Sequence, residues 1–305
     1  MRWPDDKRFA FTIFDDPDSQ TLESGRIVYS FLASHGFLTT KAVWPLAPPR
    51  TPSDHGGTCG DPAYLEWCLE LQDMGFEMAF HNATSHTSTR EETLEGLERF
   101  RQQFGHYPHT MANHYFCDEN MYHGQYRVSG VHRLIYNLLT RGAGRRFYGH
   151  VPGHPLFWGD LCKSRIKYVR NFVFGDINTL NGCPFMPYRD PDRDFVNAWF
   201  AASEGSPCSQ FVDRISEEGQ DALEEEQGAC VMYTHFGHGY VENGRLNKQF
   251  AHLMERLSEK NGWFVPVNVL LDHIEESRGI HEIQPSERRS LERRWLMHKI
   301  RHGSA

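Results

Sequence analysis

The stretch RFAFTIFDDPD, residues 8 to 18, decides how the rest of the chain is interpreted. Residues 9 to 14 are almost all apolar, which predicts a strand that is buried on both faces, and Pro17 ends it. Asp15 and Asp16 therefore stand where a strand passes into a loop. In α/β folds the catalytic groups collect at the carboxyl ends of parallel strands, so this carboxylate pair is the first candidate for chemistry.

A second candidate group follows the third apolar run of the chain, where HNATSH begins with His81 and ends with His86. Two carboxylates and two imidazoles at two strand ends are enough for an open divalent metal site with a spare base. A structural interpretation stays open beside it. Asp15 or Asp18 could cap the helix that follows, and His81 could be one of the 18 histidines of the chain without a special role.

Length and composition fit a large core, in one barrel-sized domain or in two small ones. The formal net charge is −8 at pH 7, so no basic surface dominates, which argues against nucleic acid as a main partner. No apolar run reaches the roughly 18 residues that a membrane-spanning helix needs. The opening MRWPDDKRFA lacks the apolar core of a secretory signal, and the seven scattered cysteines form no C-x-x-C pair. We therefore expect free thiols in a reducing cytoplasm.

Strand and helix patterns alternate along the chain. After the first strand, predicted strands cover residues 37–43, 76–80, 109–112, 172–174, 195–201, 229–234 and 263–267. Predicted helices cover residues 21–34, 128–139, 210–226, 246–257 and 269–276, and two more begin at Pro62 and after a capping box at Ser88 or Thr89. About seven strand and helix pairs without an internal repeat predict an α/β fold whose mainly parallel sheet closes, or nearly closes, into a barrel.

Further polar side chains follow later strands. His235 comes directly after residues 229–234, in YTHFGHG, where glycines let an imidazole approach a substrate closely. It could protonate a departing amine while Asp15 takes the proton of an attacking water, and His238 is the alternative acid. Asp176 could orient His235 or bind substrate hydroxyls, and a plain turn residue stays open there.

In this order, the FDD after a first strand, the histidine pair after a third and the Tyr-Thr-His of a late strand resemble the NodB-homology polysaccharide deacetylases, carbohydrate esterase family 4. The resemblance covers most of the chain and implies a distorted (β/α)7 barrel of the NodB-homology type. It implies a divalent metal, usually Zn²⁺, with Co²⁺, Ni²⁺ or Fe²⁺ as alternatives. The ligands would be Asp16, His81 and His86. The general base would be Asp15 and the general acid His235.

The sequence departs from that family pattern in three places. The two histidines are five residues apart rather than four, a proline follows the carboxylate pair instead of a glycine, and the arginine of the third motif has no clear counterpart. Substrate contacts are expected instead from Asn113, His114, Asp176 and His238.

The expected function is that of a metal-dependent hydrolase, a carbohydrate N-deacetylase. It would remove an N-acetyl or similar acyl group from a carbohydrate or from an intermediate of surface-glycan biosynthesis, in the cytoplasm. The alternative is a non-catalytic carbohydrate-binding barrel that keeps the scaffold without turnover.

Residues 286 to 305 form a separate tail after a barrel predicted over residues 1 to 285. The tail carries six Lys or Arg against two Glu. Leu291, Trp295 and Ile300 fall near one helical face, which is the pattern of an interfacial amphipathic helix that could contact an anionic membrane surface. The alternative is that this helix packs back on the barrel or frays.

Overall fold

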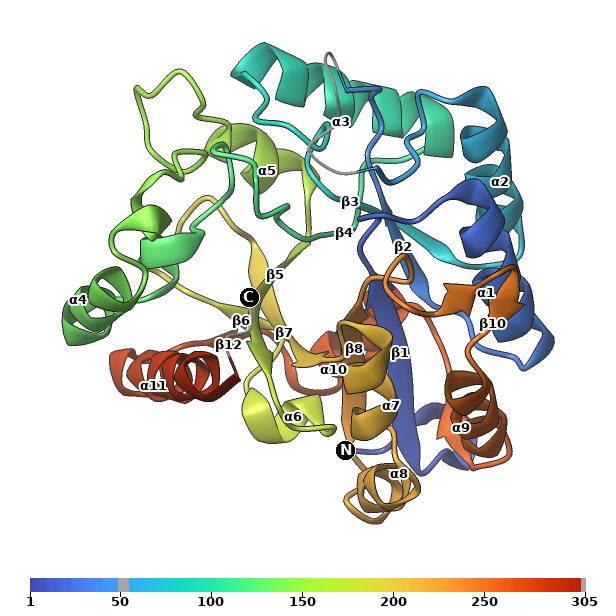
Figure 1. The fold of residues 1–305 in the computed structure, drawn as a ribbon. Coiled ribbons are helices and arrows are strands. Elements are labelled where there is room, and N and C mark those ends of the chain that lie inside the picture. The colour runs from blue at the N-terminus through green and yellow to red at the C-terminus, as the bar shows by residue number, and fades with distance from the viewer. Residues whose placement is uncertain (49–54, 303–305) are drawn as a thin grey trace.

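The computed structural model describes residues 1–48 and 55–302, so part of the loop predicted between residues 45 and 61 lies outside the described residues. Within those ranges seven parallel strands close into a barrel (Figure 1). They pair in the order β1 (Phe9–Asp15), β2 (Thr40–Val43), β3 (Glu77–Phe80), β4 (Thr110–Met111), β5 (Tyr168–Phe174), β7 (Ala198–Glu204) and β8 (Ala229–Thr234), and β8 pairs with β1 again. The predicted (β/α)7 barrel is confirmed.

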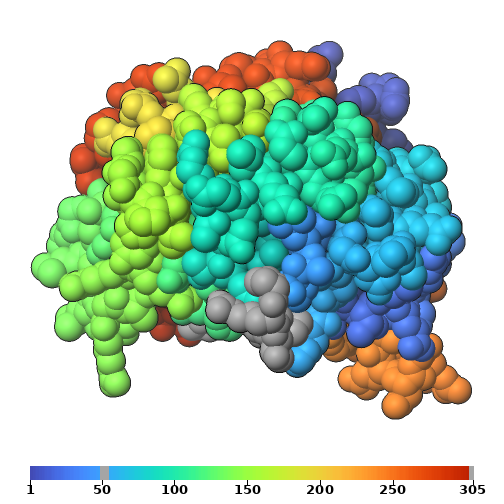
Figure 2. Space-filling view, turned by 90° about the horizontal axis from the view of Figure 1, so that it is seen from above, coloured from blue at the N-terminus to red at the C-terminus, as the bar shows by residue number. Residues whose placement is uncertain are grey.

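Helices surround this barrel (Figure 1). In chain order they are α1 (Leu22–Ser34), α2 (Pro62–Asp73), α3 (Arg90–Phe104), α4 (Gly130–Leu139), α5 (Gly159–Arg165), α6 (Thr179–Gly182), α7 (Cys208–Arg214), α8 (Glu217–Glu225), α9 (Lys248–Ser258), α10 (Val267–Arg278) and α11 (Pro285–His302). Seen from above, α2 and α3 form much of one face of the molecule (Figure 2). No helix within the described ranges is long and apolar enough to cross a membrane.

Short elements complete the described part of the chain. Its 3₁₀ helices are η1 (Pro4–Asp6), η2 (Gly124–Arg127) and η3 (Ala143–Arg145), and its short strands are β6 (Tyr188–Arg189), β9 (Val241–Glu242), β10 (Arg245–Leu246), β11 (Gly262–Trp263) and β12 (His281–Glu282). The strand β11 pairs with the start of β1, and β6 and β12 extend the sheet beyond β7.

Every residue of β1 is buried, as the apolar run predicts. The strand pairs with β8 from Ala10 to Asp15, so its register fixes the place where both strands end. Successive side chains of a strand point to opposite sides. Phe14 contacts Phe200 of β7 across the barrel, whereas Asp15 bonds to Tyr29 of the helix layer. The next residue, Asp16, again faces the barrel interior.

Helix ends follow local signals. The hydroxyl of Thr89 accepts a hydrogen bond from the backbone N–H of Glu92, and the Glu92 carboxylate accepts one from the N–H of Thr89, so the capping box of α3 lies at Thr89 rather than at Ser88. Gly105, with a φ of 83°, ends this helix.

Several predicted elements have other bounds in the structure. The strands predicted over residues 172–174 and 195–201 are β5, which begins at Tyr168, and β7, which runs from Ala198 to Glu204. The helix predicted over residues 210–226 is two helices, because the Ser216 side chain accepts a hydrogen bond from the Gly219 N–H and starts α8 as a separate helix. The strand predicted over residues 263–267 ends at Trp263, because Pro266 lies at the N-cap of α10.

The tail forms α11, which packs on β5 and α4 (Figure 1). Leu291, Trp295 and Leu296 are buried, and the Trp295 ring stacks on Tyr136 of α4 with centroids 5.6 Å apart. Ile300, predicted on the same face, is 52% exposed. Most of the apolar face of the tail is therefore in contact with the barrel.

Candidate metal centre and active site

A cavity of about 230 Å³ lies at the carboxyl ends of the barrel strands. The polar side chains that line it include Asp16, Asp18, His81, His114, Arg170 and His235. They come from five of the barrel strands, β1, β3, β4, β5 and β8, or from the loops that follow them. This is the end at which α/β barrels place their reactive groups.

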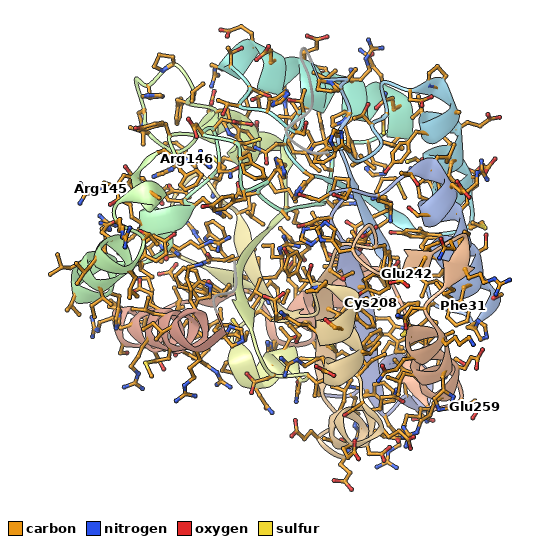
Figure 3. The ribbon with its side chains drawn as sticks, viewed as in Figure 1. Phe31, Arg145, Arg146, Cys208, Glu242 and Glu259 are labelled. Atoms are coloured by element: carbon orange, nitrogen blue, oxygen red, sulfur yellow. The ribbon has the colours of Figure 1, made fainter. Side chains whose placement is uncertain are left out.

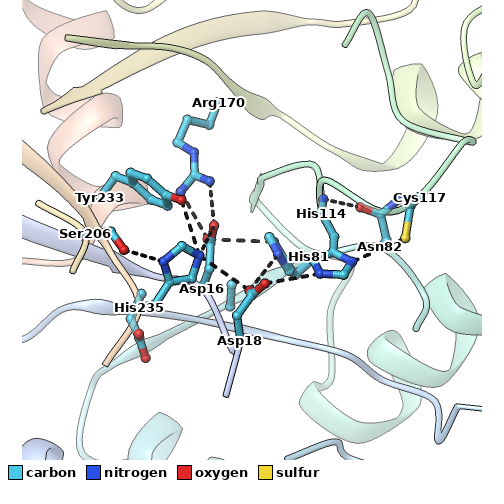
Figure 4. A network of polar contacts seen from close by, with 12 residues as sticks. Asp16, Asp18, His81, Asn82, His114, Cys117, Arg170, Ser206, Tyr233 and His235 are labelled. Carbon is cyan, nitrogen blue, oxygen red and sulfur yellow. Dashed lines mark hydrogen bonds and ion pairs between the residues drawn. The ribbon is translucent and has the colours of Figure 1, made fainter. Parts of the chain in front are cut away.

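Asp18 and two histidines form a compact group in this cavity (Figure 4). Oδ1 of Asp18 lies 3.1 Å from Nε2 of His114, and its Oδ2 lies 3.3 Å from Nε2 of His81. Within the described part of the chain, Oδ2 of Asp18, Nδ1 of His81 and Nε2 of His114 are buried and form no contact with hydrogen-bond geometry, although Oδ2 of Asp18 and Nε2 of His114 take part in the two ion-pair contacts given above. Buried polar atoms are normally satisfied, so three unsatisfied atoms in one group indicate a binding site.

This donor set fits a divalent metal ion. Two imidazoles and a carboxylate are ligands of catalytic zinc, and two ligands of a tetrahedral zinc ion lie roughly 3.3 Å apart. Oδ1 of Asp18 and Nε2 of His114 lie 3.1 Å apart, and Oδ2 of Asp18 and Nε2 of His81 lie 3.3 Å apart, which is close to this spacing. One ligand atom from each of the three residues lies within 4.8 Å of the other two. Burial opposes ionisation of Asp18, but the neighbouring imidazoles outweigh it and hold the pKa of this carboxyl well below its usual range. Asp16, Asp18 and His235 form a second group whose ligand atoms lie within 4.8 Å of one another.

Residues behind the group hold the two imidazoles. Asn82, with a φ of 63°, turns the chain directly after His81, and its Oδ1 accepts a hydrogen bond of 2.8 Å from the backbone N–H of His114. The Asn82 amide donates to Glu119 at 2.8 Å. The Trp44 ring contacts both imidazoles, with centroids 5.9 Å from His81 and 5.3 Å from His114. Such support fixes the orientation of metal-binding histidines.

Asp16 is held by a buried arginine. Nη1 and Nη2 of Arg170 donate to Oδ1 and Oδ2 of Asp16 at 3.1 and 2.6 Å, a bidentate pair (Figure 4). The guanidinium also lies over the rings of Tyr233 and Phe14, at 4.2 and 4.9 Å from their centroids. These contacts leave Asp16 with one orientation toward the cavity.

His235 lies on the other side of Asp16. Its Nδ1 is 2.6 Å from the Ser206 hydroxyl, and its Nε2 is 3.6 Å from Oδ2 of Asp18 and 3.9 Å from Oδ2 of Asp16. Burial lowers the pKa of His235, and Asp18 and Asp16 oppose this effect. His238 also lines the cavity, with its ring centroid 4.9 Å from that of His235.

Asp15 does not line this cavity. The side chain is fully buried, its Oδ1 accepts from the Phe236 N–H at 2.8 Å, and its Oδ2 accepts from Gln20 and Tyr29 at 3.0 Å each. Nζ of Lys41 lies 3.3 Å from the same oxygen. Burial raises the pKa of the Asp15 carboxyl, against these partners. The structure therefore places Asp15 as a link between β1, β2, α1 and the loop after β8.

Besides Asp15 and His238, three predicted residues lie outside the ligand groups that the described residues form. His86 belongs to neither group and does not line the cavity. Asp176 pairs with Arg294 at 2.9 Å, away from the cavity. Asn113 lines the cavity, but its side chain bonds to the backbone N–H and C=O of Met121 at 2.9 and 3.0 Å, which holds a loop.

Two residues of the site were not predicted from the sequence. Asp18 was not predicted to be a metal ligand, and Arg170 was not predicted to belong to the site. The signal for Asp18 was its position two residues after Asp16 across a proline, which turns the chain. The signal for Arg170 was a single charge inside the apolar strand YVRNFVF. This arginine places a buried guanidinium beside Asp16.

No protein-family model matches the chain, and no curated protein matches its sequence. Solved structures match the fold. A protein from Mycobacterium smegmatis assigned as a polysaccharide deacetylase has a TM-score of 0.53 and 12% identity, over 93% of this chain and 96% of its own. One from Pseudomonas aeruginosa PAO1 with the same assignment has a TM-score of 0.52 and 11% identity, over 92% and 95%. Puue allantoinase has a TM-score of 0.51 and 11% identity, over 91% and 94%. The predicted resemblance is thus confirmed for the barrel fold.

Proposed function

We propose that this chain is a metal-dependent hydrolase that removes an N-acetyl or similar acyl group from a carbohydrate. The observation that carries the proposal is the buried group of Asp18, His81 and His114, with its unsatisfied ligand atoms, directly beside Asp16 and His235. The fold likeness to two polysaccharide deacetylases and an allantoinase supports the choice of an amide as the bond that is broken.

Asp18, His81 and His114 would hold the ion, in place of the set of Asp16, His81 and His86 expected from the resemblance. Zinc is the ion that this donor set favours. When bound, such an ion acts as a Lewis acid toward the amide carbonyl and activates water.

Asp16 would be the general base. Its carboxylate lines the cavity, and the bidentate contact with Arg170 holds it in place beside Asp18. It would accept the proton of the attacking water. Asp15, one residue earlier, lacks access to the cavity, because the strand alternation turns its side chain toward α1.

His235 would be the general acid. If the Ser206 hydroxyl donates to Nδ1, the remaining proton of the neutral imidazole is on Nε2, which faces Asp16 and Asp18. From there it can be passed to the departing nitrogen. Asp15 supports this residue indirectly, because it binds the N–H of Phe236, the next residue in the chain.

The cavity suits a small substrate or one sugar unit. Its volume of about 230 Å³ is below the usual size of drug-like sites. Tyr115 and Phe116 line it with rings that are 54% and 48% exposed, and exposed rings stack well on the apolar faces of sugars.

The test is zinc content by mass spectrometry together with amine release from N-acetyl sugars. Asp18→Asn and His114→Gln should lose both zinc and amine release. Asp16→Asn should keep zinc and lose roughly 10²- to 10⁴-fold in kcat, the usual range for a general base. His86→Gln is the matched control for His114→Gln.

A His86→Gln protein without zinc, beside a His114→Gln protein with full zinc, would return the ligand role to His86. A wild-type protein that binds N-acetyl sugars and zinc but releases no amine would favour the non-catalytic carbohydrate-binding barrel.

A further inference from the structure

A buried arginine in the cavity has no acidic partner among the residues that the structure describes. Arg127, the last residue of η2, lines the cavity and is only 9% exposed. Within residues 1–48 and 55–302 it forms no ion pair with a carboxylate, whereas the other guanidinium of the cavity, Arg170, is paired with Asp16. The Arg127 guanidinium lies against Trp295 of α11, 5.5 Å from the ring centroid. Buried charges are normally paired, so this one points to a ligand.

The surroundings of Arg127 favour negative charge. Burial lowers the pKa of Arg127 to about 10, so the guanidinium stays protonated at neutral pH. Burial and Arg127 together lower the pKa of Lys299 to about 8, although Glu204 acts against this. Burial, followed by Arg127, holds the pKa of His123 well below its usual range, so this cavity residue is a neutral imidazole.

We infer that the substrate carries an anionic group, a carboxylate or a phosphate, that pairs with Arg127 while its amide lies at the metal-binding group. This inference rests on the proposed hydrolase function and names the substrate class of the same site. A guanidinium binds either anion through two parallel hydrogen bonds, which neutral substrates cannot replace. Because one cavity of about 230 Å³ contains both Arg127 and the ligand group, the anion and the amide belong to one small molecule or to one terminal unit.

Three N-acetyl sugars test this with the zinc-loaded protein. N-acetylglucosamine is neutral, its 6-phosphate carries a phosphate, and N-acetylmuramic acid carries a carboxylate. We expect kcat/KM for at least one charged sugar to exceed that of the neutral sugar by tenfold or more. The better of the two charged substrates shows whether the anionic group is a phosphate or a carboxylate. Arg127→Met should reduce this charged-to-neutral ratio to about one, a change of roughly 10- to 100-fold. Arg127→Lys should keep part of it.

Arg289→Met is the control, because Arg289 is an exposed arginine of α11. Equal kcat/KM for charged and neutral sugars, or a ratio that Arg127→Met leaves unchanged, would overturn the inference while the hydrolase stands. If no sugar is hydrolysed, the proposed function fails separately. Calorimetric binding of inorganic phosphate then still decides the role of Arg127: binding that Arg127→Met weakens tenfold supports the anion site, and equal binding overturns it.

A second surface stands out independently. On α4 the apolar side chains at i, i+3, i+4, i+7 and i+8 face solvent instead of the core. Their exposed fractions are 64% for Val131, 71% for Leu134, 38% for Ile135, 80% for Leu138 and 52% for Leu139. The opposite side of the helix is buried through Tyr136, which stacks on Trp295. Contiguous exposed apolar groups of this kind mark an interaction surface.

The charge around α4 is positive in a chain whose net charge is −8. Residues 120 to 159 contain no Asp or Glu and five arginines. Arg133, Arg141 and Arg145 are exposed, and Arg145 lies at the outer edge of the molecule beside α4 (Figure 3). An apolar stripe with basic neighbours is the pattern of helices that lie on anionic lipid surfaces.

We further propose that α4 and its arginines dock this protein on an anionic lipid surface. This assigns membrane contact to α4 rather than to the tail, because most of the apolar face of α11 is already covered. The test is flotation of the full chain with vesicles of phosphatidylcholine alone or with 30% phosphatidylglycerol. Leu134→Ser with Leu138→Ser should lower the bound fraction on anionic vesicles at least fivefold, and Arg141→Ser with Arg145→Ser should do so at low salt.

Val269→Ser is the control, since Val269 is an exposed valine of α10, 40% exposed. The proposal fails if the wild-type protein does not float with anionic vesicles, or if the double leucine variant floats equally well. It also fails if sedimentation shows a dimer that the leucine variant dissociates while flotation is unchanged, because the face then belongs to a second copy.

Discussion

Replacing Asp15 by Asn separates a buried structural carboxylate from a catalytic one. The side chain of Asp15 is fully buried and accepts hydrogen bonds from Phe236, Gln20 and Tyr29. Lys41, whose side chain is also fully buried, lies 3.3 Å away. Asn would turn one acceptor into a donor and leave the Lys41 ammonium without its counter-charge. Breaking one partner of a buried ion pair costs about 3–5 kcal/mol.

We therefore expect Asp15→Asn to lower the free energy of unfolding by about 3–5 kcal/mol at pH 7, out of the roughly 5–15 kcal/mol of a typical domain. The folded fraction should retain zinc and most of its kcat. Urea unfolding followed by tryptophan fluorescence measures the first, and zinc content and amine release per folded molecule measure the others. The double change Asp15→Asn with Lys41→Met should recover about 1–3 kcal/mol, because it removes the orphaned charge.

Asp73→Asn is the control, since Asp73 is exposed at the end of α2 and its change should stay within about 0.5 kcal/mol. The reasoning would be refuted by an Asp15→Asn protein that unfolds like the wild type but has lost 10²- to 10⁴-fold in kcat. That outcome would make Asp15 the base, as the family resemblance implies, and Asp16 a ligand or a structural group.

Three further outcomes are expected. Burial raises the pKa of Glu77 from 4.5 to about 7, so between these pH values the folded state holds a proton that the unfolded state has lost. The free energy of unfolding should therefore fall by roughly 3 kcal/mol as pH rises through this range. Glu77→Gln should flatten this part of a profile of urea midpoint against pH, and an unchanged slope would contradict the assignment to Glu77. A Cβ at Gly237 would clash with the backbone oxygen of Asp18, so Gly237→Ala should displace this proposed ligand. We expect zinc binding, measured by competition with a chelator, to weaken roughly 10- to 100-fold. An affinity equal to that of the wild type would count against the ligand role of Asp18. Removing zinc with a chelator should lower Tm by roughly 5–10 °C, if zinc is present at about 100 times its Kd, and Asp18→Asn should show no such shift.

Local patterns determined the elements of this protein. The buried run of β1, the start of α3 at a capping box and the boundary of β8 depend on residues that are close in sequence, so each could be predicted without knowing the fold, although the choice of Thr89 over Ser88 could not. Alternation of strands and helices then predicts a parallel barrel. Because the carboxyl ends of parallel strands meet at one end, the meeting of His81 with His235 also follows from the sequence.

The tertiary structure alone decided which groups face the cavity. One residue of strand alternation separates Asp15, bonded to α1 and Lys41, from Asp16, bonded to Arg170, and no local pattern distinguishes two adjacent aspartates. The turn at Asn82 directs the chain so that His114 rather than His86 reaches Asp18.

The same holds for charge and exposure. The apolar residues of α4 repeat at a helical spacing that is typical of a core-facing surface. They face solvent instead, because the opposite side of the helix packs through Tyr136 against Trp295. Arg127 and Arg170 are both buried arginines of the cavity, and only Arg170 has a carboxylate from a distant strand end beside it among the described residues. Side-chain direction in loops and the pairing of buried charges depend on residues that are far apart in sequence, 154 positions for Asp16 and Arg170, so local patterns determine the elements whereas the packed barrel determines the site.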